Sequence, residues 1–247
     1  MKTKIVLSLT LILSFFLSFS LVFNARAQKI LMETGFEEFT LNKPPKDWEA
    51  TGGGFEVTDD MVKTDAKSLG VLGGAGNQYL GLPVETEEPI ISVEFWVYIE
   101  SGGRSLTLNI TADENIASNQ GGPYINWDAG GVRYYVEADG AWSDMGKFET
   151  DKWRYVRVVS NFQDGKFDFY SGDTLEETLK AKPAKGLKFR SIVAPACKRI
   201  VFTTYGLAAP GYVDDLLVYE GAEPIRRAAV EPVEKFAAVW GKLKIRN

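Results

Sequence analysis

The chain of 247 residues contains no histidine. Without imidazole there can be no Ser-His-Asp triad, no Cys-His pair and no zinc site built on histidine ligands. Any catalysis would have to use carboxylates, tyrosine, lysine or arginine. Cysteine is nearly absent as well, because Cys197 stands alone, so no intramolecular disulfide can form. Stability therefore has to come from a hydrophobic core, supplemented by a bound metal if one is present.

Positive charge is also scarce, because 28 Lys and Arg residues stand against 33 Asp and Glu residues, a formal net charge of -5. Loss of residues 1–27 would remove Lys2, Lys4 and Arg26 but no acid, which moves the formal charge from -5 to -8. An acidic chain of this kind is a poor partner for nucleic acid or for anionic membranes. We expect neither partner once the N-terminal segment is removed.

The N-terminal segment has the pattern of an export signal. Two lysines precede an apolar run from Ile5 to Phe23, and Ala25-Arg26-Ala27 matches the small-residue box of a cleavage site before Gln28. The pattern predicts a signal peptide over residues 1–27 and a secreted protein, extracellular or periplasmic. The apolar run is long for a signal peptide, so an uncleaved membrane anchor is the alternative.

Long apolar runs and convincing helical periodicity are missing from the rest of the domain. Instead, the stretch from Ile91 to Glu100 alternates strictly, with aliphatic residues and Phe95 on one face and polar or aromatic residues on the other. Short strands of this kind follow one another, with turns about every ten residues. The pattern predicts an all-β fold, a two-sheet antiparallel jelly-roll sandwich, over residues 28–221. Residues 222–247 are then a C-terminal linker and tail.

A hairpin from Asp151 to Asp173 is the strongest local pattern. Trp153 opens its first strand, and Asp164-Gly165 supplies a tight turn before an alternating return strand. This hairpin and three further marks resemble the laminin-G-like domains of the concanavalin A-like lectin and glucanase superfamily. The further marks are Lys67-Ser68-Leu69, Val93 to Val97, and Tyr212 to Tyr219. The resemblance implies the jelly-roll fold but no single activity, because these folds serve as lectins, adhesion modules, glycosidases and lyases.

The resemblance also implies a metal site. Sugar-binding jelly rolls often pair Phe-Glu near the first strand with Asp-Asp near the last, and these two strands lie side by side. This chain has Glu37 after Phe36, and Asp214 and Asp215 after Val213. Carboxylates brought together from both ends would repel one another, and calcium is the hard cation that suits oxygen ligands. We expect a structural calcium on Glu37 and Asp214, with Asp215 in reserve; the alternative is that they are solvated or capping charges.

Aromatic residues are plentiful on the predicted strands between residues 96 and 142. Their flat rings can stack on the CH faces of sugars, while neighbouring amides and carboxylates bond the hydroxyls. Tyr134 shares parity with Val132 and Val136 and is expected in the core, whereas Tyr135 faces the other way. The alternative for every ring is core packing. The ligand-binding candidates are Trp96, Tyr98, Trp127, Tyr135 and Trp142, with Asn126 and Glu137 as hydroxyl partners; Tyr124 belongs to the same aromatic set.

Evidence for catalysis is weaker. The glucanases of this fold carry Glu-x-Asp-x-x-Glu on one strand, and that motif is absent. Glu94 and Glu100 share a strand face but lie about 20 Å apart, whereas a retaining pair needs roughly 5 Å. The sequence therefore favours a secreted, non-catalytic module that binds an extracellular glycan. The alternatives are a structural module that binds a cell-surface protein, and a carbohydrate-active hydrolase or lyase.

Overall fold

A computed structural model of the chain describes residues 28–225, except residues 75, 103–105, 119, 129, 192–194 and 206–209. The predicted signal peptide and residues 226–247 of the predicted tail lie outside the described residues. Within the described part, no helix is long and apolar enough to cross a membrane.

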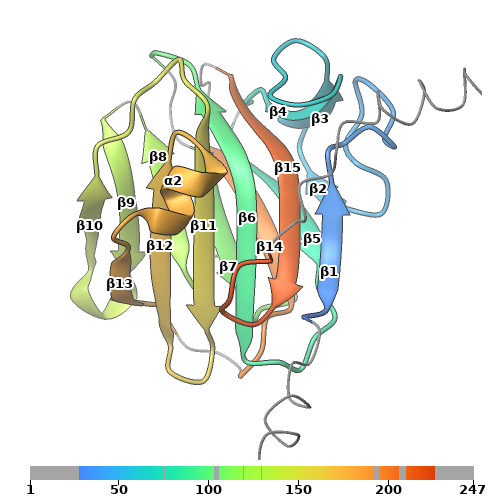
Figure 1. Ribbon diagram of the computed structural model, residues 1–247. Coiled ribbons are helices and arrows are strands. Elements are labelled where there is room, and N and C mark those ends of the chain that lie inside the picture. The colour runs from blue at the N-terminus through green and yellow to red at the C-terminus, as the bar shows by residue number, and fades with distance from the viewer. Residues whose placement is uncertain are drawn as a thin grey trace, which may run out of the picture.

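Two antiparallel sheets pack face to face, which confirms the predicted sandwich (Figure 1). The eight-stranded sheet has the order β13-β12-β11-β6-β15-β4-β3, and β1 pairs with β15 beside that path. Its strands are β1 (Ile30–Thr34), β3 (Phe55–Thr58), β4 (Ser68–Val71), β6 (Ile90–Ile99), β11 (Arg154–Asn161), β12 (Lys166–Gly172), β13 (Ala184–Lys188) and β15 (Gly211–Glu220).

The seven-stranded sheet has the order β10-β9-β8-β7-β14-β5-β2. Its strands are β2 (Glu49–Thr51), β5 (Asn77–Pro83), β7 (Leu106–Thr111), β8 (Tyr124–Asp128), β9 (Gly131–Val136), β10 (Ala141–Gly146) and β14 (Arg199–Tyr205). A 3-10 turn, η1 (Glu137–Asp139), joins β9 to β10, and a short helix, α2 (Leu175–Lys180), follows β12.

The core lies between the sheets, where the strict alternation of β6 places its apolar face. Every inward residue of this strand from Ile91 to Ile99 is buried. Phe95 packs edge-on against Trp127 and Phe202 of the opposite sheet, with ring centroids 5.8 and 5.9 Å apart. Burying each side chain of this size stabilises the fold by about 1.5–3 kcal/mol, so the core can hold the sandwich together without a disulfide.

Helix α2 is an element that the sequence pattern did not predict. Thr174 caps its first turn by accepting a hydrogen bond from the Glu177 amide at 3.1 Å, and Lys180 closes the last turn. Six residues are too few for a visible apolar periodicity, so the helix depends on tertiary contacts. Its buried Thr178 donates to the Tyr155 carbonyl at 3.3 Å, which fixes α2 on the outer face of the eight-stranded sheet (Figure 1).

Candidate functional site

Three aromatic rings lie together on the outer face of the seven-stranded sheet, across strands β8, β9 and β10. Trp142 lies opposite Tyr135 in the β10–β9 register, with ring centroids 5.4 Å apart, and its ring is 5.5 Å from that of Tyr124. The Trp142 side chain is 38% exposed, one of two large apolar side chains in the described residues that reach solvent to this extent. We refer to Tyr124, Tyr135 and Trp142 as the aromatic platform.

Two guanidinium groups stack on the aromatic platform. The Arg133 group lies 4.9 Å from the Trp142 ring centre, and the Arg190 group lies 4.9 Å from Tyr124 and 5.0 Å from Tyr135. Cation–π contacts of this kind hold both partners in place. Arg190 also pairs loosely with Glu137, at 4.0 Å between Nε and Oε2. The platform therefore combines one partly exposed ring, Trp142, with N–H donors and a carboxylate around it.

A polar floor continues the same face toward the centre of the sheet. It consists of Thr107, Asn109, Asn126 and Thr203, all at most 3% exposed. The Asn126 amide donates to the Thr107 hydroxyl at 2.8 Å. Within the described chain, neither amide atom of Asn109 nor the hydroxyl of Thr203 has a hydrogen-bond partner. Leaving a buried donor or acceptor without a partner lowers the free energy of unfolding by about 1–3 kcal/mol. The unpaired amide of Asn109 is therefore unfavourable for stability.

The tyrosines at the border of the polar floor come from strands on either side of β7. The hydroxyls of Tyr124 on β8 and Tyr205 on β14 contact each other. Burial raises the pKa of Tyr124, so its hydroxyl stays protonated and acts as a hydrogen-bond group rather than as a base.

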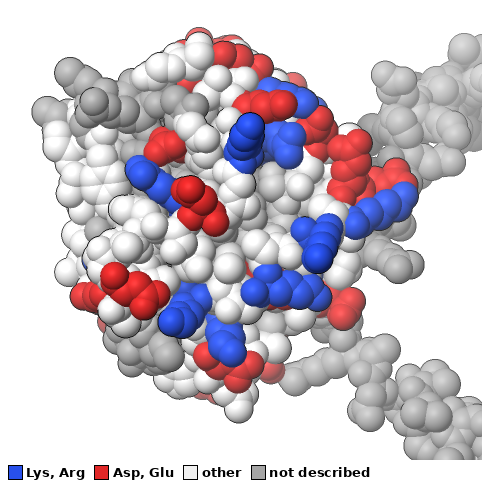
Figure 2. Space-filling view, turned by 90° about the vertical axis from the view of Figure 1, so that its left-hand side faces the viewer, with Lys and Arg blue, Asp and Glu red and all other residues white. Residues whose placement is uncertain are grey.

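A cavity of about 410 Å³ adjoins the aromatic platform through Arg133. Its polar lining includes Asp128, Asp144 and Lys147, and Arg133 pairs with Asp128 at 2.9 Å. Figure 2, which views the edge of the molecule where β10 lies, shows basic and acidic side chains interspersed rather than a field of one sign. Alternating charges around a partly exposed ring suit a hydroxyl-rich ligand better than a strongly charged one.

The structure brings four of the predicted ligand-binding residues together here: Asn126, Tyr135, Glu137 and Trp142. Trp96 and Tyr98 lie instead on the outer face of the eight-stranded sheet, because β6 belongs to that sheet. Four further residues of this face were not predicted: Arg133, Arg190, Asn109 and Thr203. A single sequence does not show which cations come to lie over rings, or which polar residues lose their partners on folding.

Trp127 requires a correction, because it points into the core and is fully buried. As a predicted ligand-binding residue, its ring would have to reach solvent. Strand parity decides otherwise, because Trp127 shares its face of β8 with Ile125, and both pack between the sheets. Its ring contacts Phe169 at 6.3 Å in addition to Phe95.

The predicted metal ligands do lie near one loop, between β3 and β4. Glu37 Oε1 accepts the amides of Ala66 and Lys67 at 2.9 and 2.7 Å. Asp214 Oδ2 accepts the amides of Lys63 and Thr64 at 2.9 and 3.0 Å.

These carboxylates thus act as clamps on the backbone of residues 63–67. Burial raises the pKa of Asp214 to about 6, despite the amides that favour its ionised form. In the described residues no group of three or more His, Cys, Asp or Glu side chains is arranged to hold a metal ion. Calcium binding by Glu37, Asp214 and Asp215 therefore stays a prediction.

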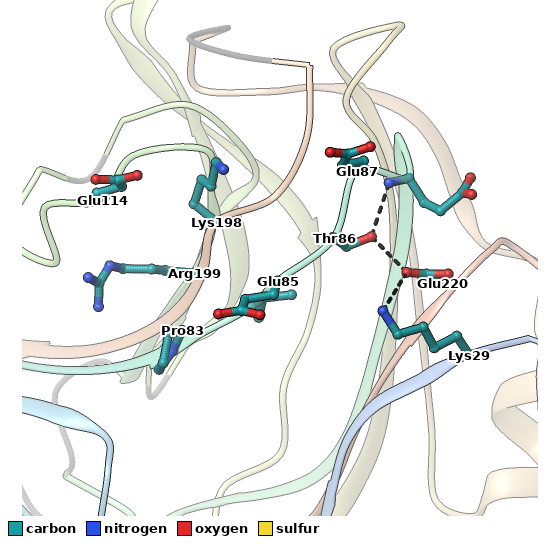
Figure 3. Close-up of a pocket in the computed structure, with 11 residues that line it drawn as sticks. Lys29, Pro83, Glu85, Thr86, Glu87, Glu114, Lys198, Arg199 and Glu220 are labelled. Carbon is teal, nitrogen blue, oxygen red and sulfur yellow. Dashed lines mark hydrogen bonds and ion pairs between the residues drawn. The ribbon is translucent and has the colours of Figure 1, made fainter.

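A larger cavity of about 670 Å³ lies at the end of β15 (Figure 3). Its lining is rich in glutamates, and it contains no aromatic ring. Glu220 pairs with Lys29 at 3.6 Å and accepts a bond from Thr86 at 2.9 Å. Without a ring to stack on, this hollow is a weaker candidate for sugar binding than the aromatic platform.

The fold and this face together define an antiparallel β-sandwich with an aromatic site on one sheet. No family model matches the sequence, and no curated protein matches it either. Solved structures do share the fold.

A sialidase matches with a TM-score of 0.57 and 13% identity over 76% of this chain, which spans 18% of the sialidase's length. A carbohydrate esterase from the Shiga toxin-encoding bacteriophage phi24B matches with a TM-score of 0.53 and 14% identity, over 79% of this chain and 100% of that one. The catalytic domain of a glycoside hydrolase family 131 protein from Coprinopsis cinerea matches with a TM-score of 0.52 and 9% identity, over 81% and 98%. At these identities the likeness concerns the fold alone.

Proposed function

We propose that the chain is a secreted, non-catalytic carbohydrate-binding module of the concanavalin A-like type, which takes an extracellular glycan on the aromatic platform. The observation that carries the proposal is the partly exposed Trp142 ring beside Tyr135, with Arg133 and Arg190 stacked at their faces. A pyranose presents one flat CH face and a rim of hydroxyls. A partly exposed ring with donors and acceptors around it matches that shape.

The polar floor supports the same function. Asn109 offers an unused donor and an unused acceptor, and Thr203 offers an unused hydroxyl. A sugar hydroxyl, or a water that bridges to one, would satisfy these groups. Binding would then recover part of the free energy that the fold loses by burying them unpaired.

A carbohydrate-active enzyme is the second candidate. The observation that favours it is the presence of two carboxylates, Asp128 and Asp144, in the lining of one cavity. Glycoside hydrolysis requires such a pair, one as acid and one as nucleophile or base. Arg133 forms an ion pair with Asp128 at 2.9 Å, so one of the two carboxylates already has a partner in the fold.

The test is a glycan-array screen of residues 28–247, followed by calorimetric titration of the best oligosaccharide. Trp142→Ala removes the stacking ring and is expected to weaken binding roughly tenfold or more, since an aromatic stack is worth about 0.5–1.5 kcal/mol beyond its buried area. Ile30→Ala is the matched control, because Ile30 is the other exposed large apolar side chain among the described residues and lies on β1 of the eight-stranded sheet.

Three results would decide the matter. Loss of binding in Trp142→Ala with none in Ile30→Ala supports the module. Equal affinity in wild type and Trp142→Ala would rule out the platform as the site. Release of reducing sugar by the wild-type protein, abolished by Asp144→Asn, would favour the enzyme.

A further inference from the structure

A third, smaller cavity lies on the outer face of the eight-stranded sheet, on the opposite side of the sandwich from the aromatic platform. Its volume is about 160 Å³. Strands β6, β11 and β15, helix α2 and the segment after β15 all contribute to it; α2 and the red segment after β15 lie in front of this sheet in Figure 1. The lining residues are Glu94, Trp96, Tyr155, Leu175, Asp215 and Ile225. We refer to this cavity as the β6 pocket.

One wall of the β6 pocket is a hydrogen-bonded carboxylate. Glu94 is 2% exposed and accepts the hydroxyls of Tyr155 at 2.7 Å and Tyr219 at 2.5 Å. Burial and this carboxylate raise the pKa of Tyr219 to about 12, so Tyr219 remains a donor. Arg157, also buried, pairs with Glu94 at 3.0 Å and offsets its charge. Glu94 is therefore held rigidly with its charge balanced, although it faces a cavity.

The other wall is apolar. The Trp96 ring meets the Tyr155 ring edge-on at 5.0 Å, and the Lys63 ammonium lies 4.3 Å from the Trp96 ring centre. Leu175 and Ile225 complete this wall, and both keep part of their surface exposed to solvent. The β6 pocket thus has one flat apolar side and one side of oxygen acceptors, and solvent can reach it.

The segment from Gly221 to Ile225 closes one side of the pocket and is fixed to the sheet. The Gly221 amide donates to the Ile90 carbonyl at 2.8 Å, and the Ser92 hydroxyl donates to the Gly221 carbonyl at 2.7 Å. The Arg157 guanidinium donates to the Ala222 carbonyl. The same arginine therefore orients Glu94 and anchors the segment that carries Ile225, so both walls are positioned together.

We propose that the β6 pocket is a second binding site, which takes a single neutral pyranose ring. A volume of about 160 Å³ corresponds to roughly five water molecules at about 30 Å³ each, which suits one sugar residue rather than a chain. The apolar wall would stack on the CH face, and Glu94 and Asp215 would accept hydroxyls. Because Arg157 offsets Glu94, a neutral ring fits better than a cationic one. This site does not depend on the aromatic platform.

The test separates the two sites by using Trp142→Ala as the background. Saturation-transfer NMR would be recorded with methyl glucoside, methyl galactoside, methyl mannoside and methyl fucoside as the probes. In this background Ile225→Trp fills the pocket from a partly exposed position, and Trp96→Ala removes the stacking wall. Trp153→Ala is the matched control, because Trp153 packs on Tyr98 of the same sheet but does not line the pocket.

The expected result is transfer to at least one methyl pyranoside, lost in Ile225→Trp and in Trp96→Ala and kept in Trp153→Ala. No transfer to any probe would overturn the proposal, as would transfer that survives Ile225→Trp. Transfer to methyl glucosaminide, recorded as a fifth and cationic probe, without transfer to any of the four neutral probes would overturn the assignment of a neutral ligand. Circular dichroism shows whether each variant is folded; if Trp96→Ala is not, Ile225→Trp alone decides. Failure here leaves the oligosaccharide titration of the platform unaffected.

Discussion

Asn109 is the residue at which stability and function are most clearly opposed. Its amide is 1% exposed and lacks any hydrogen-bond partner in the described part of the chain, although it lies on a face rather than in the core. A residue chosen only for stability would be apolar here, because an unpaired buried amide costs more than a leucine of similar volume. Positions that break the rules of stable packing are often functional.

Asn109→Leu is therefore expected to increase stability and to weaken ligand binding. The melting temperature should rise by a few degrees, because the orphaned groups are gone, and the affinity for the platform's glycan should fall. Thermal denaturation and calorimetry measure the two effects. Ser160→Ala is the control, because Ser160 is also buried without a hydrogen-bond partner among the described residues but belongs to the other sheet. This change should raise the melting temperature and leave affinity unchanged. Unchanged affinity in Asn109→Leu would show that the polar floor does not contact the ligand.

Asp214 gives the fold an unusual dependence on pH. Its pKa of about 6 in the folded state lies above the usual 3.8, so the folded protein takes up a proton before the unfolded chain does. Above pH 6 the ionised Asp214 carboxylate is buried, and this lowers the free energy of unfolding. As the pH falls from 6 toward 4 the carboxylate is protonated in the folded state, and this destabilisation disappears. Because the chain has no histidine, no imidazole titrates in this range.

We therefore expect the free energy of unfolding, measured by urea denaturation in EDTA, to increase between pH 7 and pH 5 by about 1.3 kcal/mol. In Asp214→Asn this increase should be absent, whatever the stability of the variant itself. At still lower pH the trend should reverse, because hydrogen bonds from Ser118 and Lys152 hold the pKa values of Asp113 and Asp173 below the usual range. A stability that is flat from pH 7 to 5 in the wild type would contradict this assignment.

At the scale of elements, the loop between β3 and β4 is held from both ends of the chain. Glu37 follows β1 and Asp214 lies on β15. Each carboxylate accepts hydrogen bonds from two consecutive backbone amides of residues 63–67. Strands β1 and β15 bring the two carboxylates near each other by pairing antiparallel. Two carboxylates beside one loop could bind a cation. The hydrogen bonds from the loop amides to these carboxylates nevertheless hold the loop in place without a cation.

Calcium decides between these roles. If Glu37 and Asp214 bind it, then EDTA should lower the melting temperature of calcium-loaded protein by several degrees, because a ligand of the folded state stabilises it. Glu37→Gln should keep the amide acceptor but lose the EDTA effect. An unchanged melting temperature, in protein that mass spectrometry shows to be loaded beforehand, would leave the carboxylates as loop clamps only.

The elements also show how far a single sequence predicts such a fold. The alternation in β6 and the Asp164-Gly165 turn, where Gly165 has a φ of 62°, indicate strands and a hairpin because local chemistry determines both. The pairing of β7 with β14 does not follow from local chemistry, and neither does the face to which Trp127 points. The seven predicted ligand residues consequently divide among two outer faces and the core. Helix α2 escaped prediction because its stability comes from contacts with β11 and β12.

At the scale of the whole molecule, the aromatic platform and the β6 pocket lie on the outer faces of different sheets. One short oligosaccharide cannot reach both, because the whole core lies between them. If both sites bind, a single chain can connect two glycans and gain affinity for dense surfaces by multivalency. The two sites also differ in shape, since the aromatic platform is a cluster of rings at the surface and the β6 pocket is a small cavity for a single sugar ring.

Strand β15 has a consequence for how the molecule is made. It pairs with β6 on one side and with β1 and β4 on the other, so the last strand in the described part of the chain lies in the middle of the eight-stranded sheet. During synthesis this sheet has a gap at its centre until residues 211–220 have emerged. Because long-range pairing of this kind is slow to form, we expect the centre of this sheet to close late in folding.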